Sequence, residues 1–221
     1  MTLSANCAKC TKFSCCTEKP DQGPKNCPIK VHPDAIESAW RVYQEQDVME
    51  FARFASVQEA ECYMHLPEGM TPRNPRIEEI AQFAHKMGYT KLGVAFCVGL
   101  TGEARTVTEI LENRGFDVVS VCCKVGAVSK NDIGVTEDQK IADPGQWETM
   151  CNPVGQAQVL NAEETHFNVA VGLCVGHDSL FFKHADAPTT VLVAKDRVFG
   201  HNPAAGLYLS NSYYGKLRRK E

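Results

Sequence analysis

Cysteine is the residue type in this chain whose placement predicts chemistry. Three apolar runs are typical of parallel strands covered on both faces, and each carries a cysteine near its carboxyl end. They are Cys97 in 91–98, Cys123 in 117–123 and Cys174 in 168–175. Open α/β sheets bind their ligands at the carboxyl ends of the strands. We therefore expect these thiols to converge at one edge of a sheet.

A fourth cysteine fits the same rule. Cys151 precedes Asn152-Pro153 and a helix expected over about 155–165. A helix N-terminus stabilises thiolate, which is both the metal ligand and the nucleophile, through its dipole and unpaired N–H groups. We expect Cys97, Cys123, Cys151 and Cys174 to form a four-sulfur metal site. The alternative is that they pack as small hydrophobic residues at strand ends.

A second group of cysteines lies in the first 28 residues, in a polar segment with too few apolar side chains to form a core. Such a segment needs a metal or a cross-link to become ordered. The preferred ligand set is Cys7, Cys10, Cys15 and Cys27, with Cys16 as a spare.

The spacing of these cysteines bears on the identity of the metal. Zinc sites are typically built from two paired C-x2-C knuckles. This segment has one knuckle followed by isolated cysteines, and Cys27 precedes a proline, as in many iron–sulfur runs. Because the spacing matches neither ferredoxin pattern, both metals stay open. We expect one or two iron–sulfur clusters of the 4Fe-4S type, with zinc as the alternative.

Four further residues near the predicted sheet edge are candidates for a catalytic role: Cys122, Lys124, His177 and Asp178. Neighbouring strand residues point to opposite faces, so Cys122 would pack or act as a free thiol while Cys123 joins the cluster. Lys124 could hold a thiolate or an anionic substrate by its charge. His177 and Asp178 could supply a general acid or base, although Asp at that place is also an ordinary helix N-cap.

The elements that must position these residues alternate regularly. Helices are expected from Pro33, from Asp47 to about Met64, and from Pro75 to Lys86. From Lys91 onward, strands alternate with helices, and a fourth strand is expected over 189–195.

Strands separated by crossover helices predict a parallel sheet. The fold class is therefore a three-layer α/β domain with a parallel sheet of about four strands, preceded by helices and a cysteine-rich segment. We expect a metal-binding segment over 1–30 and an α/β domain over 31–221, with a helical part over 33–88 that covers the sheet part over 91–221.

Composition narrows the function classes. Of the 221 residues, 43% are hydrophobic and 23% charged, which is ordinary for a globular protein. The net charge of −4 gives no reason to expect nucleic acid as a partner. No apolar segment approaches the roughly 20 residues that span a membrane, and no apolar signal core begins the sequence. We expect a cytoplasmic protein, in whose reducing surroundings eleven cysteines favour metal binding or reactive thiols over disulfides.

Several common catalytic motifs do not occur in the sequence. It contains no G-x-S-x-G elbow, no P-loop, and no G-x-G-x-x-G after the first predicted strand of the sheet. Their absence weakens an interpretation as a serine hydrolase, an NTPase or a dinucleotide-binding enzyme.

In combination, the cysteine motifs resemble an uncharacterised prokaryotic family of cysteine-rich proteins to which metal binding is ascribed, frequent in anaerobes. The motifs are the amino-terminal C-x2-C-x4-C…C-P pattern, Phe96–Leu100, Cys122-Cys123-Lys124, Met150–Pro153 and Gly172–Asp178. The resemblance covers essentially the whole chain. It implies metal binding and no particular reaction.

Two functional hypotheses follow. The first is an iron–sulfur protein with a redox or sulfur-handling role. It could be an enzyme that acts on a small anionic substrate, or it could exchange electrons with a redox partner protein. The second is a zinc-binding structural or metal-handling protein without turnover. In either case the amino-terminal cysteines would cover the carboxyl edge of the sheet, or form a tethered knuckle that binds a partner protein.

Overall fold

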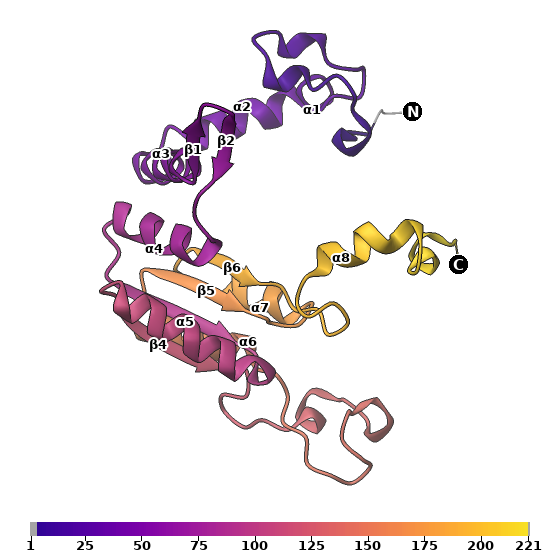
Figure 1. Cartoon of the computed structure of the whole chain (residues 1–221). Coiled ribbons are helices and arrows are strands. Elements are labelled where there is room, and N and C mark those ends of the chain that lie inside the picture. Colours follow the sequence, from indigo (N-terminus) through magenta and orange to yellow (C-terminus); the bar gives the residue numbers. More distant parts are fainter. Residues whose placement is uncertain (1–3, 221) are drawn as a thin grey trace. The chain divides into compact units, whose positions relative to one another are not determined.

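The computed structural model describes residues 4–220, and the chain divides into two compact units, residues 1–61 and 62–221 (Figure 1). Each unit is described by itself. The expectation that the amino-terminal cysteines cover the sheet edge therefore stays a prediction.

The first unit begins with short 3-10 turns and continues with three helices. These are α1 (Pro28–Val31), α2 (Pro33–Val42) and α3 (Gln46–Glu61). Proline occupies the first position of α1 and of α2, where its fixed φ suits a helix and its missing N–H is no loss. The helices predicted from Pro33 and Asp47 are confirmed.

The second unit opens with a β-hairpin that the sequence did not predict. Strands β1 (Tyr63–Leu66) and β2 (Gly69–Pro72) pair antiparallel, where we expected the end of a helix and a break. Gly69, with φ of 134°, supplies a turn conformation that a side chain would resist. The hairpin explains why α3 ends at Glu61 instead of near Met64.

The sheet of the second unit has four parallel strands, as predicted. They are β3 (Lys91–Phe96), β4 (Asp117–Cys122), β5 (Phe167–Val171) and β6 (Thr189–Val193), in the order β4-β3-β5-β6. β4, the next strand in the chain, lies on one side of β3, and the later strands β5 and β6 lie on the other side. The gap between the carboxyl ends of β3 and β5 is therefore a topological switch point, the usual place for a ligand in such sheets.

Helices flank this sheet (Figure 1). They are α4 (Arg76–Lys86), α5 (Thr101–Asn113), α6 (Pro153–Ala162) and α7 (His177–His184), and α8 (Pro203–Tyr208) follows β6. Helix α5 packs on β3 and β4. Helices α6 and α7 contribute to one apolar core with the sheet: Ala95, Val121, Ala157, Leu160, Ala170, Leu173 and Phe181. Within residues 4–220, no helix is long and apolar enough to cross a membrane.

The packing of α6 on the sheet depends on a glycine in the central strand β3. A Cβ atom at Gly93 would lie 2.1 Å from Asn168 Oδ1 and 2.9 Å from Leu160 Cδ1. The first of these atoms belongs to β5 and the second to α6, and both residues are fully buried. Neither can move away cheaply in a close-packed interior.

We therefore predict that Gly93→Ala lowers the free energy of unfolding by about 1–3 kcal/mol, the usual cost of overpacking a core. The measurement is chemical denaturation of the metal-free protein. Gly102→Ala is the matched control, because nothing lies within 4 Å of a Cβ at Gly102 in α5. That change should stabilise the protein by about 0.5–1 kcal/mol. Equal stability of the two variants would contradict the steric argument.

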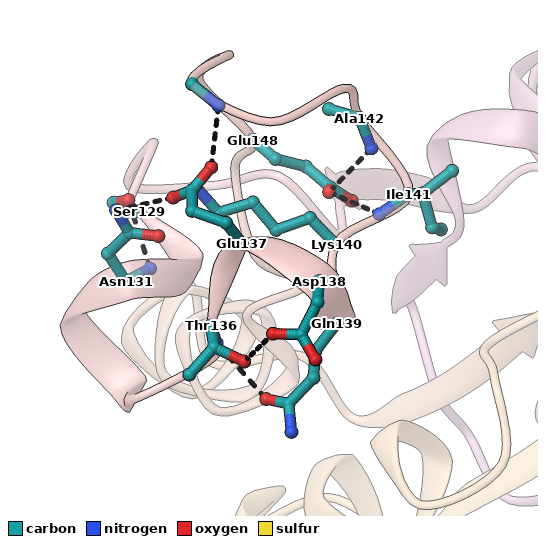
Figure 2. A network of polar contacts seen from close by, with 11 residues as sticks. Ser129, Asn131, Thr136, Glu137, Asp138, Gln139, Lys140, Ile141, Ala142 and Glu148 are labelled. Carbon is teal, nitrogen blue, oxygen red and sulfur yellow. Dashed lines mark hydrogen bonds and ion pairs between the residues drawn. The ribbon is translucent and has the colours of Figure 1, made fainter.

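A long connection joins β4 to α6 and returns to the sheet edge beside its starting point. Its two ends pair at an antiparallel bridge between Ser129 and Thr149. Next to the bridge, Lys130 Nζ lies 2.6 Å from Glu148 Oε1. Glu148 Oε2 accepts hydrogen bonds from the backbone N–H groups of Ile141 (2.8 Å) and Ala142 (3.1 Å), as Figure 2 shows. The segment thus forms a closed loop.

Glu148 makes this closure dependent on pH. The hydrogen bond from Lys130, supported by those from the two amides, lowers the pKa of the Glu148 carboxyl from 4.5 to about 2. A carboxyl whose pKa is lower in the folded than in the unfolded protein stabilises the folded form at pH values above the unfolded-state pKa. This stabilisation is lost as the pH falls toward the pKa of the folded state. We predict that the loop loosens between about pH 4.5 and pH 2.

The measurement is the fluorescence of Trp147 in a Trp40→Phe background, which leaves one tryptophan in the chain. Glu148→Gln should remove the acid transition. Glu163→Gln is the control and should keep the transition, because Glu163 pairs with Lys91 outside this loop. An unchanged transition in Glu148→Gln would show that other groups govern the loop.

Candidate metal centre

The four cysteines predicted to meet at the sheet edge line one small, partly open space that is too narrow to hold a water molecule. Its lining consists of Cys97, Cys123, Cys151, Leu173, Cys174 and His177. The sulfurs arrive from the loops after β3, β4 and β5 and from the residue before the N-cap of α6. This is the switch point between β3 and β5. No disulfide involves any of these four cysteines.

Backbone hydrogen bonds between neighbouring strands extend to two of the cysteines and fix the position of their backbone. The N–H of Cys97 donates to the Val171 carbonyl at 3.1 Å, and the N–H of Cys123 donates to the Phe96 carbonyl at 2.8 Å. Beyond these bonds the chain leaves strand geometry. Both strands end earlier than expected. β3 ends at Phe96, because the chain then turns toward α5. β5 ends at Val171, because Gly172 adopts a φ of 66°, which is not a strand conformation.

Cys151 is placed by the residue that follows it. The N–H of Asn152 donates to the Cys123 carbonyl at 2.7 Å, and its side-chain Nδ2 donates to the Val125 carbonyl at 3.1 Å. Asn152 Oδ1 accepts from the N–H of Gly155 at 2.8 Å and so caps α6. One asparagine therefore ties the start of α6 to the loop after β4.

Three of the sulfurs interact directly with one another. Cys123 affects the pKa of both Cys97 and Cys151. The hydrogen bond with Cys151, followed by burial, raises the pKa of the Cys123 thiol far above its ordinary value. The hydrogen bond from Cys123 is the main cause that lowers the pKa of Cys151, to about 5. Burial raises the pKa of Cys97, but hydrogen bonds from Lys195 and the Gly99 backbone outweigh it, so the pKa falls.

Each of the four sulfurs also receives a nitrogen donor. Lys195 Nζ lies 3.1 Å from Cys97 Sγ, and Lys124 Nζ lies 3.7 Å from Cys151 Sγ. Arg197 Nη2 lies 3.2 Å from Cys174 Sγ, and the backbone N–H of Val98 donates to Cys123 Sγ at 3.3 Å. Three cations thus stand at one sulfur site. The sulfur of Cys174 in turn raises the pKa of Arg197.

Sequence reasoning named Lys124 and missed Lys195 and Arg197. Lys124 also donates to the Thr149 carbonyl at 2.6 Å, so it bridges the two ends of the β4–α6 connection. Lys195 and Arg197 follow β6 directly. Their position just after a fourth parallel strand was the available signal, since that strand ends at the same edge as the cysteines.

The remaining catalytic candidates differ in position. His177 lines the sulfur space, and its Nδ1 is buried without a hydrogen-bond partner. Asp178 Oδ1 accepts from the N–H groups of Gly176 (3.0 Å) and Ser179 (2.7 Å). The N-cap of α7 is Gly176, so Asp178 does not have the N-cap position considered as its alternative role. Cys122 is the last residue of β4 and does not line the space.

In the first unit, the preferred amino-terminal set lines a small pocket of its own, with a volume of about 40 Å³. Cys7, Cys10, Cys15 and Cys27 all contribute to it, and Cys16 does not. The N–H of Cys10 donates to the Cys7 carbonyl at 3.0 Å and closes the knuckle turn. A Cβ at Gly23 would lie 3.2 Å from Cys27 Sγ, so a glycine lets the chain pass close to this cysteine.

The donors at the sheet edge suit a metal by their chemistry. Thiolate and imidazole are ligands for zinc and for iron–sulfur clusters. Within residues 4–220, however, no three His, Cys, Asp or Glu side chains form a group that could hold a metal ion in their present positions. The buried and unpartnered Nδ1 of His177 is a free donor atom beside the sulfurs. The residues therefore fit a metal centre in type, and the bound positions would differ from those seen.

Two comparisons place the chain among known sequences. A family model described as "Protein of unknown function (DUF1847)" matches residues 27–192. An uncharacterized protein, MJ0455, of the archaeon Methanocaldococcus jannaschii is 40% identical over 210 residues, which cover 95% of this chain and 96% of the relative. The family match contains all four sheet-edge cysteines and His177. Of the amino-terminal set it contains only Cys27.

The pKa of Cys151 yields a prediction for the metal-free protein. Because its thiolate persists down to about pH 5, Cys151 should react with iodoacetamide in mildly acidic solution, where an ordinary thiol is almost inert. Cys123→Ala removes the hydrogen bond that contributes most, so the midpoint of the reaction should rise by more than about one pH unit. The measurement is the alkylation rate of Cys151 against pH, followed by peptide mass spectrometry.

Lys195→Met is the control, because Lys195 contacts Cys97 and not Cys151. The midpoint for Cys151 should stay unchanged in that variant. A shift in Lys195→Met as large as that in Cys123→Ala would contradict the assignment of the effect to Cys123.

Proposed function

The chain belongs to the DUF1847 family, and we propose that its sheet-edge cysteines hold a metal centre, an iron–sulfur cluster with a redox or sulfur-handling role in the cytoplasm. Cys97, Cys123 and Cys151 provide three thiolate ligands. The fourth ligand comes from the turn that contains Cys174 and His177.

The observation that carries this proposal is that every sulfur at the site has a nitrogen donor. Thiolates gathered in one small space repel one another, and partial burial removes the water that would screen them. The cations Lys124, Lys195 and Arg197 offset this repulsion. Cysteines that served only as small apolar residues would need no such cations, and partly burying lysine beside them would be unfavourable.

The same donors support iron over zinc. Hydrogen bonds to cluster sulfurs help to set the reduction potential of an iron–sulfur centre, and outer-shell partners of this kind tune a redox metal. Zinc has no redox chemistry to tune.

The partner or substrate implied by the site is anionic. Arg197 is largely open to solvent and lies beside the sulfur site, so its guanidinium can pair with a carboxylate or phosphate as well as with Cys174. A small anionic substrate, or an acidic face of a redox partner protein, suits this side of the centre.

Anaerobic purification followed by visible absorbance and by iron and zinc analysis tests the proposal. We expect a coloured protein that contains iron. Cys123→Ser should lose the iron bound at the sheet edge, with at least a tenfold fall in its retention against a chelator.

Cys122→Ser is the matched control, since the neighbouring residue does not line the site, and its iron content should equal that of the wild type. A colourless protein with stoichiometric zinc would exclude the cluster and favour the zinc alternative. Unchanged metal in Cys97→Ser, Cys123→Ser and Cys151→Ser would exclude the sheet-edge centre altogether.

A further inference from the structure

His177 carries a donor atom that the structure leaves unused. Its Nδ1 is buried and has no hydrogen-bond partner, a condition shared with only two other buried side-chain atoms, Gln156 Oε1 and Asn168 Nδ2, in the part of the chain that the structure describes. Buried polar atoms in native proteins are almost always satisfied. Since His177 lines the sulfur space, this nitrogen is available to whatever binds there.

Cys174 stands in a different situation from the other three cysteines. Its sulfur pairs with Arg197 Nη2 at 3.2 Å, and Cys174 is not among the groups that shift the pKa of Cys97, Cys123 or Cys151 most strongly, whereas Cys123 shifts the pKa of both Cys97 and Cys151. The residue is also partly exposed and precedes Val175, whose exposed fraction is 91%. Cys97 and Cys123, by contrast, are buried.

We propose that His177, through Nδ1, is the fourth ligand of the sheet-edge metal centre, and that Cys174 remains outside the ligand set as a thiol beside Arg197. This inference rests on the proposed metal centre and specifies its donors as three sulfurs and one nitrogen.

The local structure favours His177 for this role. It is the first residue of α7, and its N–H donates to the Cys174 carbonyl at 3.0 Å, so the imidazole is mounted on a rigid element. Three thiolates and one neutral imidazole place less negative charge in the small space than four thiolates do. Such a set is found with zinc and, in a related form, with iron–sulfur centres, so the inference does not depend on which metal is bound.

Differential alkylation of the full-length protein, isolated anaerobically with its own metal, tests the ligand set. Iodoacetamide is added to the loaded protein, and peptide mass spectrometry then gives the extent of modification at each cysteine. Because the readout is specific to each residue, metal bound by the amino-terminal cysteines does not interfere. We expect at least tenfold protection of Cys97 and Cys151 relative to chelator-treated protein, and no protection of Cys174. Cys123 is left out of this comparison, because burial and its raised pKa keep it unreactive with or without metal.

Variants at His177 test the nitrogen ligand directly. His177→Asn should abolish the protection of Cys97 and Cys151, whereas His184→Asn, at the other end of α7, should leave it unchanged. His177→Cys should restore it, because a thiolate can take the place of the imidazole. The wild-type pattern at Cys174 needs no variant and keeps the inference testable if His177→Asn fails to fold.

The outcomes separate the inference from the proposed function. If Cys174 is protected as strongly as Cys97 and Cys151, or if His177→Asn keeps their protection, the inference is wrong and the metal centre stands. If the loaded and chelator-treated proteins show the same modification at all of these cysteines, the sheet-edge centre itself is wrong, and the inference fails with it.

Discussion

Parallel pairing of β3 with both of its neighbours is the constraint on which the rest of the second unit depends. It brings the loops after β3, β4 and β5 to one edge, and the last ladder hydrogen bonds are those made by the N–H groups of Cys97 and Cys123. The register is held where Gly93 lets Asn168 and Leu160 approach the strand. A slip of one residue would turn the inward side chains to the other face and separate the sulfurs.

The charges at this edge form a balanced group. A protonated Cys123 at this edge limits the repulsion that adjacent thiolates would otherwise cause. Cations from the loops after β4 and β6 neutralise what remains. Metal binding would release the Cys123 proton, because a thiol must ionise to become a ligand. The lysines already in place would then stabilise the added negative charge.

The order and type of most elements of the second unit could be predicted, because the strands are uninterrupted apolar runs and the cysteines stand at equivalent places after them. The hairpin of β1 and β2 could not, since its turn and its second strand contain Pro67, Gly69 and Pro72, which are ordinary breaking signals. Lys195 and Arg197 lacked any spacing motif, and a lone cation after a strand is usually solvated. The buried nitrogen of His177 depends on where α7 begins, to within one residue, and sequence patterns do not fix helix ends that closely.

The connection between β4 and α6 has two parts with different structural roles. Its ends, near Lys124 and Asn152, position a sulfur, while the part between Ser129 and Thr149 closes on itself through the bridge and Glu148. The entropy of closing a loop grows only slowly with its length. A change in the length of this part should therefore have little effect on the cysteines, and we expect a grafted peptide or label to be tolerated there. It is the place in the molecule where evolution, or an experimenter, can add a new recognition surface without rebuilding the site.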